Sequence, residues 1–130
     1  MKTNKLLLAS LIAGLLGTPL IANAYDGDWK RGHVYYRMVC TSCHVEKAGG
    51  SIGPSGRTKA EWASYVQADK HAKGKDSLKF YVSKSYRDSI SATNKAAAKF
   101  ADVPEQELLE DIKAFVLRSA KDGDAPTGCR

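Results

Sequence analysis

The sequence has few residues of the kinds that build sheets, repeats or metal sites made from protein ligands alone. No alternation of apolar and polar residues is long enough to predict a β-strand, and no segment repeats along the chain. Cysteine occurs three times, at Cys40, Cys43 and Cys129, and no second pair of ligands lies at the spacing of a zinc site. Methionine occurs only at positions 1 and 38, so no thioether is available after residue 38. The missing strand pattern favours an all-α protein.

The charge is only mildly basic. Lysine and arginine total 20 against 14 aspartate and glutamate residues, which gives a net charge of +6. A nucleic-acid-binding domain usually has a larger and more clustered basic excess, so no nucleic-acid partner is expected.

The first 24 residues are typical of a cleaved secretory signal peptide. Lys2 and Lys5 precede an uncharged apolar stretch at positions 6–21, and the stretch ends on Ala22-Asn23-Ala24. An uncleaved anchor is the alternative, but the run is short for a bilayer span. We expect cleavage after Ala24, export to the periplasm and no membrane span in the mature protein.

The rest of the chain is expected to form one small domain over residues 25–120, followed by a flexible tail at 121–130. The tail is rich in Gly, Pro and Asp and has no apolar period. Cys129 lies in it, either as a free thiol or as an intermolecular partner.

Two helices are expected in the first half of the domain. Asp28 can cap the first, which runs from Trp29 to the region of Cys40. Thr58 and Glu61 form a possible capping box for the second.

Two more helices are expected in the second half. Asp76 can cap a helix that extends to Tyr86, and a polar stretch at 89–99 follows it. The last helix has Pro104 in its first turn. Its apolar stripe consists of Leu108, Ile112, Phe115 and Val116.

Residues 40–44 read Cys-Thr-Ser-Cys-His and carry the clearest chemical signal. Two cysteines at this spacing can each form a thioether with one porphyrin vinyl group, and His44 then lies beneath the iron as the proximal ligand. A thioredoxin-like redox pair would need a strand before it, and a zinc site would need a second ligand pair. The run therefore predicts one covalent haem c on Cys40, Cys43 and His44.

With this run identified, the sequence resembles the class I cytochromes c over nearly all of its length after the predicted signal peptide. The run from Gly27 to Gly32, followed by Tyr36, resembles that family's first helix, in which a glycine and an aromatic pack against the last helix. Ile112 and Phe115 occupy the matching positions here. The resemblance implies a small all-α fold with helices wrapped around one haem.

The same resemblance implies a role for Pro54. Gly53-Pro54 is similar to the Gly-Pro pair after the family's attachment site, where the proline carbonyl accepts a hydrogen bond from the proximal histidine. Pro54 would then orient His44 and strengthen it as a donor to iron.

The sixth iron ligand departs from the family pattern. The family usually supplies a methionine before the last helix, and the match of Phe100-Ala101 to a family pair leaves Ala98 at that position. Met38 lies beside the attachment cysteines, where packing is the simpler role.

His71 is the best replacement, because it lies 27 residues beyond His44, far enough to return over the distal face. A surface histidine is the alternative. His33 is expected at the surface, and Lys95 or Lys99 could bind iron only when deprotonated. A bis-histidine iron would have a lower potential than a His/Met iron.

These features predict a soluble, monomeric one-electron carrier rather than an enzyme, with redox partners that present acidic docking surfaces. A five-coordinate haem protein that binds a small gas or peroxide is the first alternative. The second is a haem electron-entry subunit of a larger oxidoreductase, with Cys129 or the tyrosines Tyr35, Tyr81 and Tyr86 at an interface.

A narrower resemblance concerns the monohaem cytochromes encoded beside the Mto porin-cytochrome conduit of iron-oxidising bacteria. It depends on Tyr35-Tyr36-Arg37, residues 57–62, residues 121–124 and the missing methionine. It implies a shuttle between outer-membrane and inner-membrane carriers, although no residue by itself indicates iron oxidation.

Overall fold

The computed structural model describes residues 24–47, 52–71 and 76–126. These residues form helices joined by turns, with no strand among them, so the all-α prediction is confirmed. The elements in chain order are α1 (Trp29–Tyr35), η1 (Tyr36–Cys40, a π-helix), α2 (Thr41–Lys47), η2 (Pro54–Gly56, a 3-10 turn), α3 (Lys59–Ala68), α4 (Leu78–Val82), α5 (Lys84–Ile90), α6 (Lys95–Ala98) and α7 (Glu105–Arg118).

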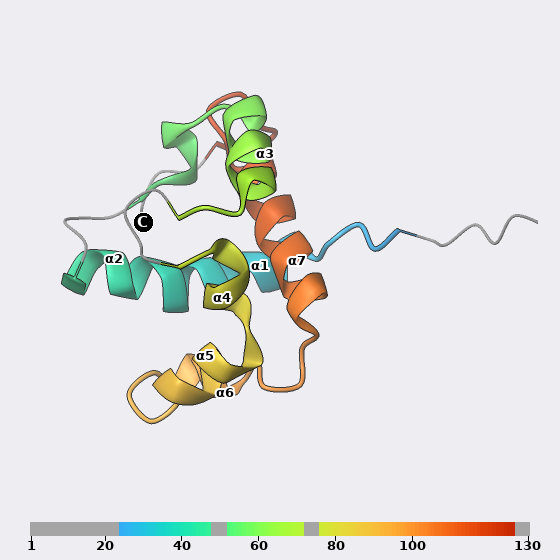
Figure 1. Ribbon diagram of the computed structural model, residues 1–130. Helices are drawn as coiled ribbons and strands as arrows, with labels where there is room; N and C mark the ends of the chain where they lie inside the picture. Colours follow the sequence, from blue (N-terminus) through green and yellow to red (C-terminus); the bar gives the residue numbers. More distant parts are fainter. Residues whose placement is uncertain (1–23, 48–51, 72–75, 127–130) are drawn as a thin grey trace, which may run out of the picture.

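The first helical rod is longer than expected. Figure 1 shows α1, η1 and α2 as one continuous rod, so the helix passes through the Cys40–His44 run and ends at Lys47. Asp28 caps it as predicted, because its carboxylate accepts hydrogen bonds from the backbone N–H groups of Lys30 and Arg31.

The start of α3 is also as predicted. The Thr58 hydroxyl accepts from the Glu61 backbone N–H at 3.2 Å, and the Glu61 carboxylate accepts from the Thr58 backbone N–H at 2.7 Å. Both bonds of the capping box are therefore formed.

The helix expected from Asp76 to Tyr86 is two helices instead. Ser77 rather than Asp76 caps α4, and Ser83 is extended, with φ −63° and ψ 150°. The Ser83 hydroxyl accepts from the Tyr86 backbone N–H and so begins α5. A serine side chain that satisfies a backbone donor in this way competes with helix continuation.

The core is built where α1 crosses α7 (Figure 1). A Cβ on Gly32 would lie 2.0 Å from the Asp111 carbonyl oxygen, so only glycine lets the two backbones approach this closely. One turn later, the rings of Tyr36 and Phe115 are 5.3 Å apart. The predicted packing of a glycine and an aromatic against the last helix is thus present.

Two clusters of buried residues lie on either side of Cys40, which packs against both. Cluster 1 is Tyr35, Val39, Val82, Ala97, Phe100, Leu108 and Leu109. Cluster 2 is Tyr36, Trp62, Phe115, Val116 and Ala120.

The first part of the expected tail is bonded to the domain. The Lys121 backbone N–H donates to the Arg57 carbonyl at 2.9 Å, and the Asp122 carboxylate accepts from the Lys59 backbone N–H at 2.7 Å. These bonds hold residues 121–122 against the start of α3. Cys129 lies outside the described residues.

The predicted signal peptide lies almost entirely at positions 1–23, outside the described residues. Among the helices that are described, none is long and apolar enough to cross a membrane.

Candidate functional site

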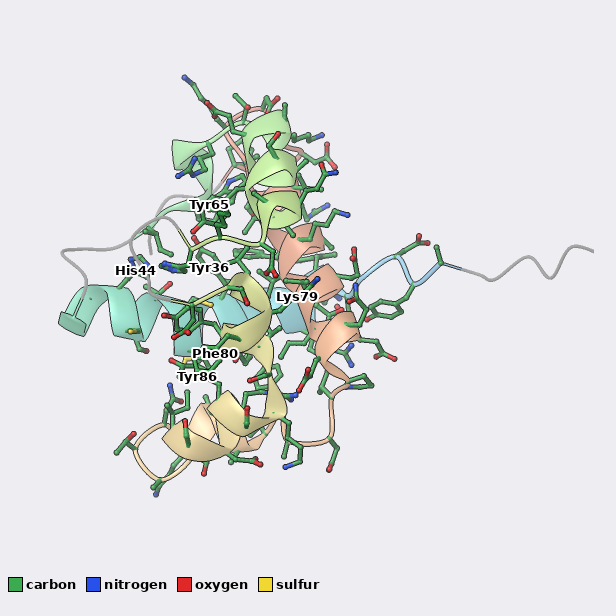
Figure 2. All side chains as sticks on the ribbon, viewed as in Figure 1. Tyr36, His44, Tyr65, Lys79, Phe80 and Tyr86 are labelled. Atoms are coloured by element: carbon green, nitrogen blue, oxygen red, sulfur yellow. The ribbon has the colours of Figure 1, made fainter. Side chains whose placement is uncertain are left out.

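Cys40, Cys43 and His44 lie close together on the helical rod. Positions three and four apart are neighbours on a helix, so Cys40 lies next to both Cys43 and His44 within one turn. Figure 2 shows His44 pointing from α2 toward the region between α3 and α4. Cys40 and Cys43 are both free thiols, so no disulfide joins them.

The His71 ring contacts the His44 ring, although the two residues are far apart in the sequence. It lies just after α3, and the two Nε2 atoms are 3.4 Å apart, with ring centroids at 5.4 Å. The structure therefore brings together the two histidines that the sequence proposed as ligands, across 27 residues of chain.

A metal ion between these imidazoles fits with a small adjustment. Bonds from a metal to histidine nitrogen are about 2.0–2.1 Å, so two opposed imidazoles need an Nε2–Nε2 separation of about 4 Å. The observed 3.4 Å requires the rings to part by roughly 0.6 Å. Side-chain torsions of two half-buried histidines can supply that displacement.

The second nitrogen of His71 lacks a hydrogen-bond partner within the described ranges. His71 Nδ1 is buried and has no hydrogen-bond partner in the part of the chain that the structure describes. An unsatisfied buried nitrogen costs about 1–3 kcal/mol. No hydrogen bond at Nδ1 orients this ring among the described residues, and a ligand at Nε2 would not supply that missing partner.

Aromatic rings line the side of the site formed by α4 and α5. The His71 ring lies 5.1 Å from Tyr81, and Tyr81 lies 5.2 Å from Tyr86. Burial raises the pKa values of Tyr81 and Tyr86, so both phenols stay neutral at physiological pH. Phe80 completes this wall, with its ring 5.4 Å from Tyr86. A flat apolar group placed between the histidines would be shielded from water on this side.

Cys40 is a poor candidate for thiolate chemistry. Burial raises the pKa of its thiol to about 12. Redox cysteine pairs and zinc ligands act as thiolates, and their pKa is normally lowered. This environment counts against a redox-active thiolate at Cys40. The described residues contain no group of three His, Cys, Asp or Glu side chains that could hold a metal ion.

The Pro54 carbonyl accepts hydrogen bonds from other groups in the structure. It accepts from the Trp62 indole N–H at 2.7 Å and from the Arg57 backbone N–H at 3.3 Å. The Trp62 bond fixes the loop after the attachment helix against α3. A hydrogen bond from His44 to Pro54 stays a prediction.

The remaining ligand candidates lie elsewhere. Met38 is 44% exposed, and its carbonyl accepts from the Asn94 amide at 2.7 Å. That bond ties the start of α6 to the rod. Ala98, at the expected methionine position, is exposed, as are Lys95 and Lys99.

His33 is half-buried rather than at the surface. Its ring stacks on Phe115, with the centroids 4.7 Å apart. This contact belongs to the packing of α1 on α7 and leaves His33 away from the pair formed by His44 and His71.

Two residues near the site were not singled out from the sequence. Asn94 caps α6 and also bonds to Met38, and its signal is an Asn directly before a helix-favouring run. Arg87 is buried, and nothing in the local sequence distinguishes it from a surface arginine.

Comparison with protein-family models, with curated proteins and with solved structures finds no match to this chain. The assignment of a function therefore depends on the chain's own residues.

Proposed function

We propose that the protein is a c-type cytochrome that carries one electron at a time. In this proposal one haem is attached through Cys40 and Cys43, and its iron lies between His44 and His71. The observation that carries it is the approach of the two Nε2 atoms to 3.4 Å, beside two free cysteines at the attachment spacing. When bound, the haem supplies a couple between Fe(II) and Fe(III).

The protein's own residues perform three tasks around that couple. The rod carries Cys40, Cys43 and His44 within one helical turn, so the attachment points and one iron ligand would be held together. His71 would hold the iron together with His44, and the neutral rings of Tyr81 and Tyr86 would exclude water next to it. With two protein side chains holding the iron, a substrate would find no open iron site, which favours electron transfer over gas or peroxide chemistry.

The finer fold assignment belongs to the same proposal. The contact of Gly32 with Asp111, together with the pair of Tyr36 and Phe115, supports a class I arrangement of first and last helices. We propose that the remaining helices wrap around the haem in this arrangement, and that the mature protein is a periplasmic monomer.

Acidic redox partners fit the charge near the attachment helix. Arg37, Lys95 and Lys99 are exposed and form no ion pair within the described ranges, whereas Lys79 and Lys84 are paired with Asp69 and Asp88.

Arg37 lies on η1, Lys95 lies on α6 and Lys99 follows directly after α6; the bond from Asn94 to Met38 holds α6 against η1. The three cations give a positive face that would attract an acidic surface. The narrower sequence resemblance would place the partners at the outer and inner membranes.

The test is spectroscopic. The purified protein should contain covalent haem, show a low-spin ferric spectrum, and not bind carbon monoxide rapidly after reduction, since both axial positions are filled. A high-spin ferric spectrum with rapid carbon monoxide binding would support the five-coordinate alternative. A protein expressed with the haem-attachment machinery but lacking haem would contradict the proposal altogether.

A further inference from the structure

A positively charged side chain is buried in the core and is connected to the proposed haem site by a chain of contacts. Arg87 on α5 is only 1% exposed. Its Nη1 donates to the Phe100 carbonyl, its Nη2 to the Val103 carbonyl at 3.0 Å, and its Nε to the Ser83 carbonyl at 3.3 Å. All three acceptors are neutral backbone groups.

No carboxylate neutralises this charge. In the described parts of the chain, no aspartate or glutamate oxygen lies within ion-pair distance of Arg87, and Asp88, its neighbour on α5, pairs with Lys84 instead. A guanidinium remains protonated inside proteins. Buried charges are normally paired, because removing a charge from water is costly. Arg87 therefore keeps a full positive charge in the interior, held only by carbonyl dipoles.

Arg87 is linked to the site through two buried rings. Phe100, whose carbonyl accepts from Arg87, packs edge-on against Tyr35 at 5.0 Å. Tyr35 belongs to cluster 1, against which Cys40 packs. Its hydroxyl donates to the Tyr81 carbonyl at 2.6 Å, and the Tyr81 ring contacts His71.

The electrostatic effect of Arg87 on Tyr35 also connects Arg87 to the site. Burial raises the pKa of Tyr35, a charge on Cys40 would raise it further, and the Arg87 charge lowers it. Arg87 thus acts on a phenol that belongs to the cluster against which Cys40 packs, in a low-dielectric interior.

We propose that Arg87 raises the reduction potential of the haem and so offsets part of the lowering caused by bis-histidine ligation. The inference rests on the proposed function. Ferric iron carries one more positive charge than ferrous iron, so a fixed buried cation nearby disfavours the ferric form. Salt screens such a buried charge much less than a surface charge, so the effect persists at high ionic strength.

The test compares Arg87→Met with the wild-type holoprotein by redox titration followed optically. The variant should fold, because the Ser83 carbonyl keeps its bond from the residue-87 backbone N–H and the Phe100 carbonyl keeps its bond from Val103. We expect a lower potential with an unchanged low-spin spectrum. Lys113→Met removes one exposed cation, whose partner is Glu110, and should leave the potential near the wild-type value.

Arg87→Lys provides a second test that separates charge from hydrogen bonding. Both variants lose the guanidinium fork, but the lysine variant keeps a charge whose pKa is lowered by burial. Its potential should lie near wild type at low pH and fall toward that of Arg87→Met as the ammonium loses its proton. The nearby phenols of Tyr35 and Tyr86 have raised pKa values, and Asp88 is paired with Lys84, so these groups do not mimic the step.

Equal potentials in wild type and Arg87→Met would overturn the inference. If Arg87→Met fails to fold, the Arg87→Lys variant decides instead. A difference in reduction potential between Arg87→Lys and wild type that does not change with pH up to pH 10 would also overturn the inference. In either case an intact low-spin spectrum would leave the proposed function standing, whereas a wild-type protein without haem would remove the function itself.

Discussion

The closest approach of α1 to α7, at Gly32, makes a quantitative prediction. In Gly32→Ala the new Cβ would lie 2.0 Å from the Asp111 carbonyl oxygen and 2.3 Å from the carbonyl carbon, so the helices must separate. Adding a methyl group to a packed core costs about 1–3 kcal/mol, and contact with backbone puts this position near 3. The better helix propensity of alanine returns about 1 kcal/mol. We expect a net loss of about 2 kcal/mol in the free energy of unfolding.

Urea unfolding of the ferric holoprotein measures this loss directly. A loss of about 2 kcal/mol corresponds to a fall in Tm of roughly 8–16 °C for a domain of this size. Gly56→Ala is the matched control, because its Cβ would have no atom within 4 Å, and its stability should change by less than about 0.5 kcal/mol. A Gly32→Ala protein as stable as wild type would refute the packing of α1 on α7 described above.

Three further predictions concern charged groups. The buried carboxylate of Asp111 accepts from Tyr25, from the Asp28 backbone N–H and from Arg31, so Asp111→Asn should lose about 3 kcal/mol in urea unfolding; no loss would contradict this network. The backbone N–H of Thr58 lowers the pKa of Glu61 below its usual 4.5, so its stabilising contribution is present above pH 4.5 and is lost as pH falls through the lowered pKa. Unfolding midpoints measured against pH should fall less steeply in Glu61→Gln, and identical curves would argue against the capping box. In a triple Arg37→Glu, Lys95→Glu, Lys99→Glu variant, oxidation of the ferrous protein by the anionic probe hexacyanoferrate(III) should be slower than in wild type at low salt. The two rates should approach each other near 1 M salt, where the screening length is about 3 Å. Equal rates at low salt would contradict the proposed docking face.

Local sequence was sufficient where a helix start depends on adjacent residues. The caps at Asp28 and Thr58 use donors within three positions of the capping residue, so composition alone predicts them. The break at Ser83 was missed because Leu78, Val82 and Tyr86 fit one helical period. Whether one helix or two helices form depends on whether the Ser83 hydroxyl accepts a hydrogen bond from the Tyr86 backbone N–H, and hydrophobic periodicity does not predict that bond.

The candidate site was also only partly predictable from local sequence. The attachment run and His71 were identifiable as residue types at a spacing, but their meeting depends on the length and direction of α3, which only the fold supplies. Arg87 was missed because arginine is usually exposed. Its burial requires the carbonyl group of Ser83, directly before α5, and those of Phe100 and Val103, which the turn after α6 brings back toward α5.

The central claim is that His44 and His71 both bind the iron of a covalently attached haem. Ferric spectra of His71→Ala, with His33→Ala as the control histidine, test it most directly. The account predicts that His71→Ala converts a low-spin spectrum to high-spin, while His33→Ala, whose ring packs on Phe115, remains low-spin. A low-spin spectrum in His71→Ala that matches wild type would show that His71 is not the ligand.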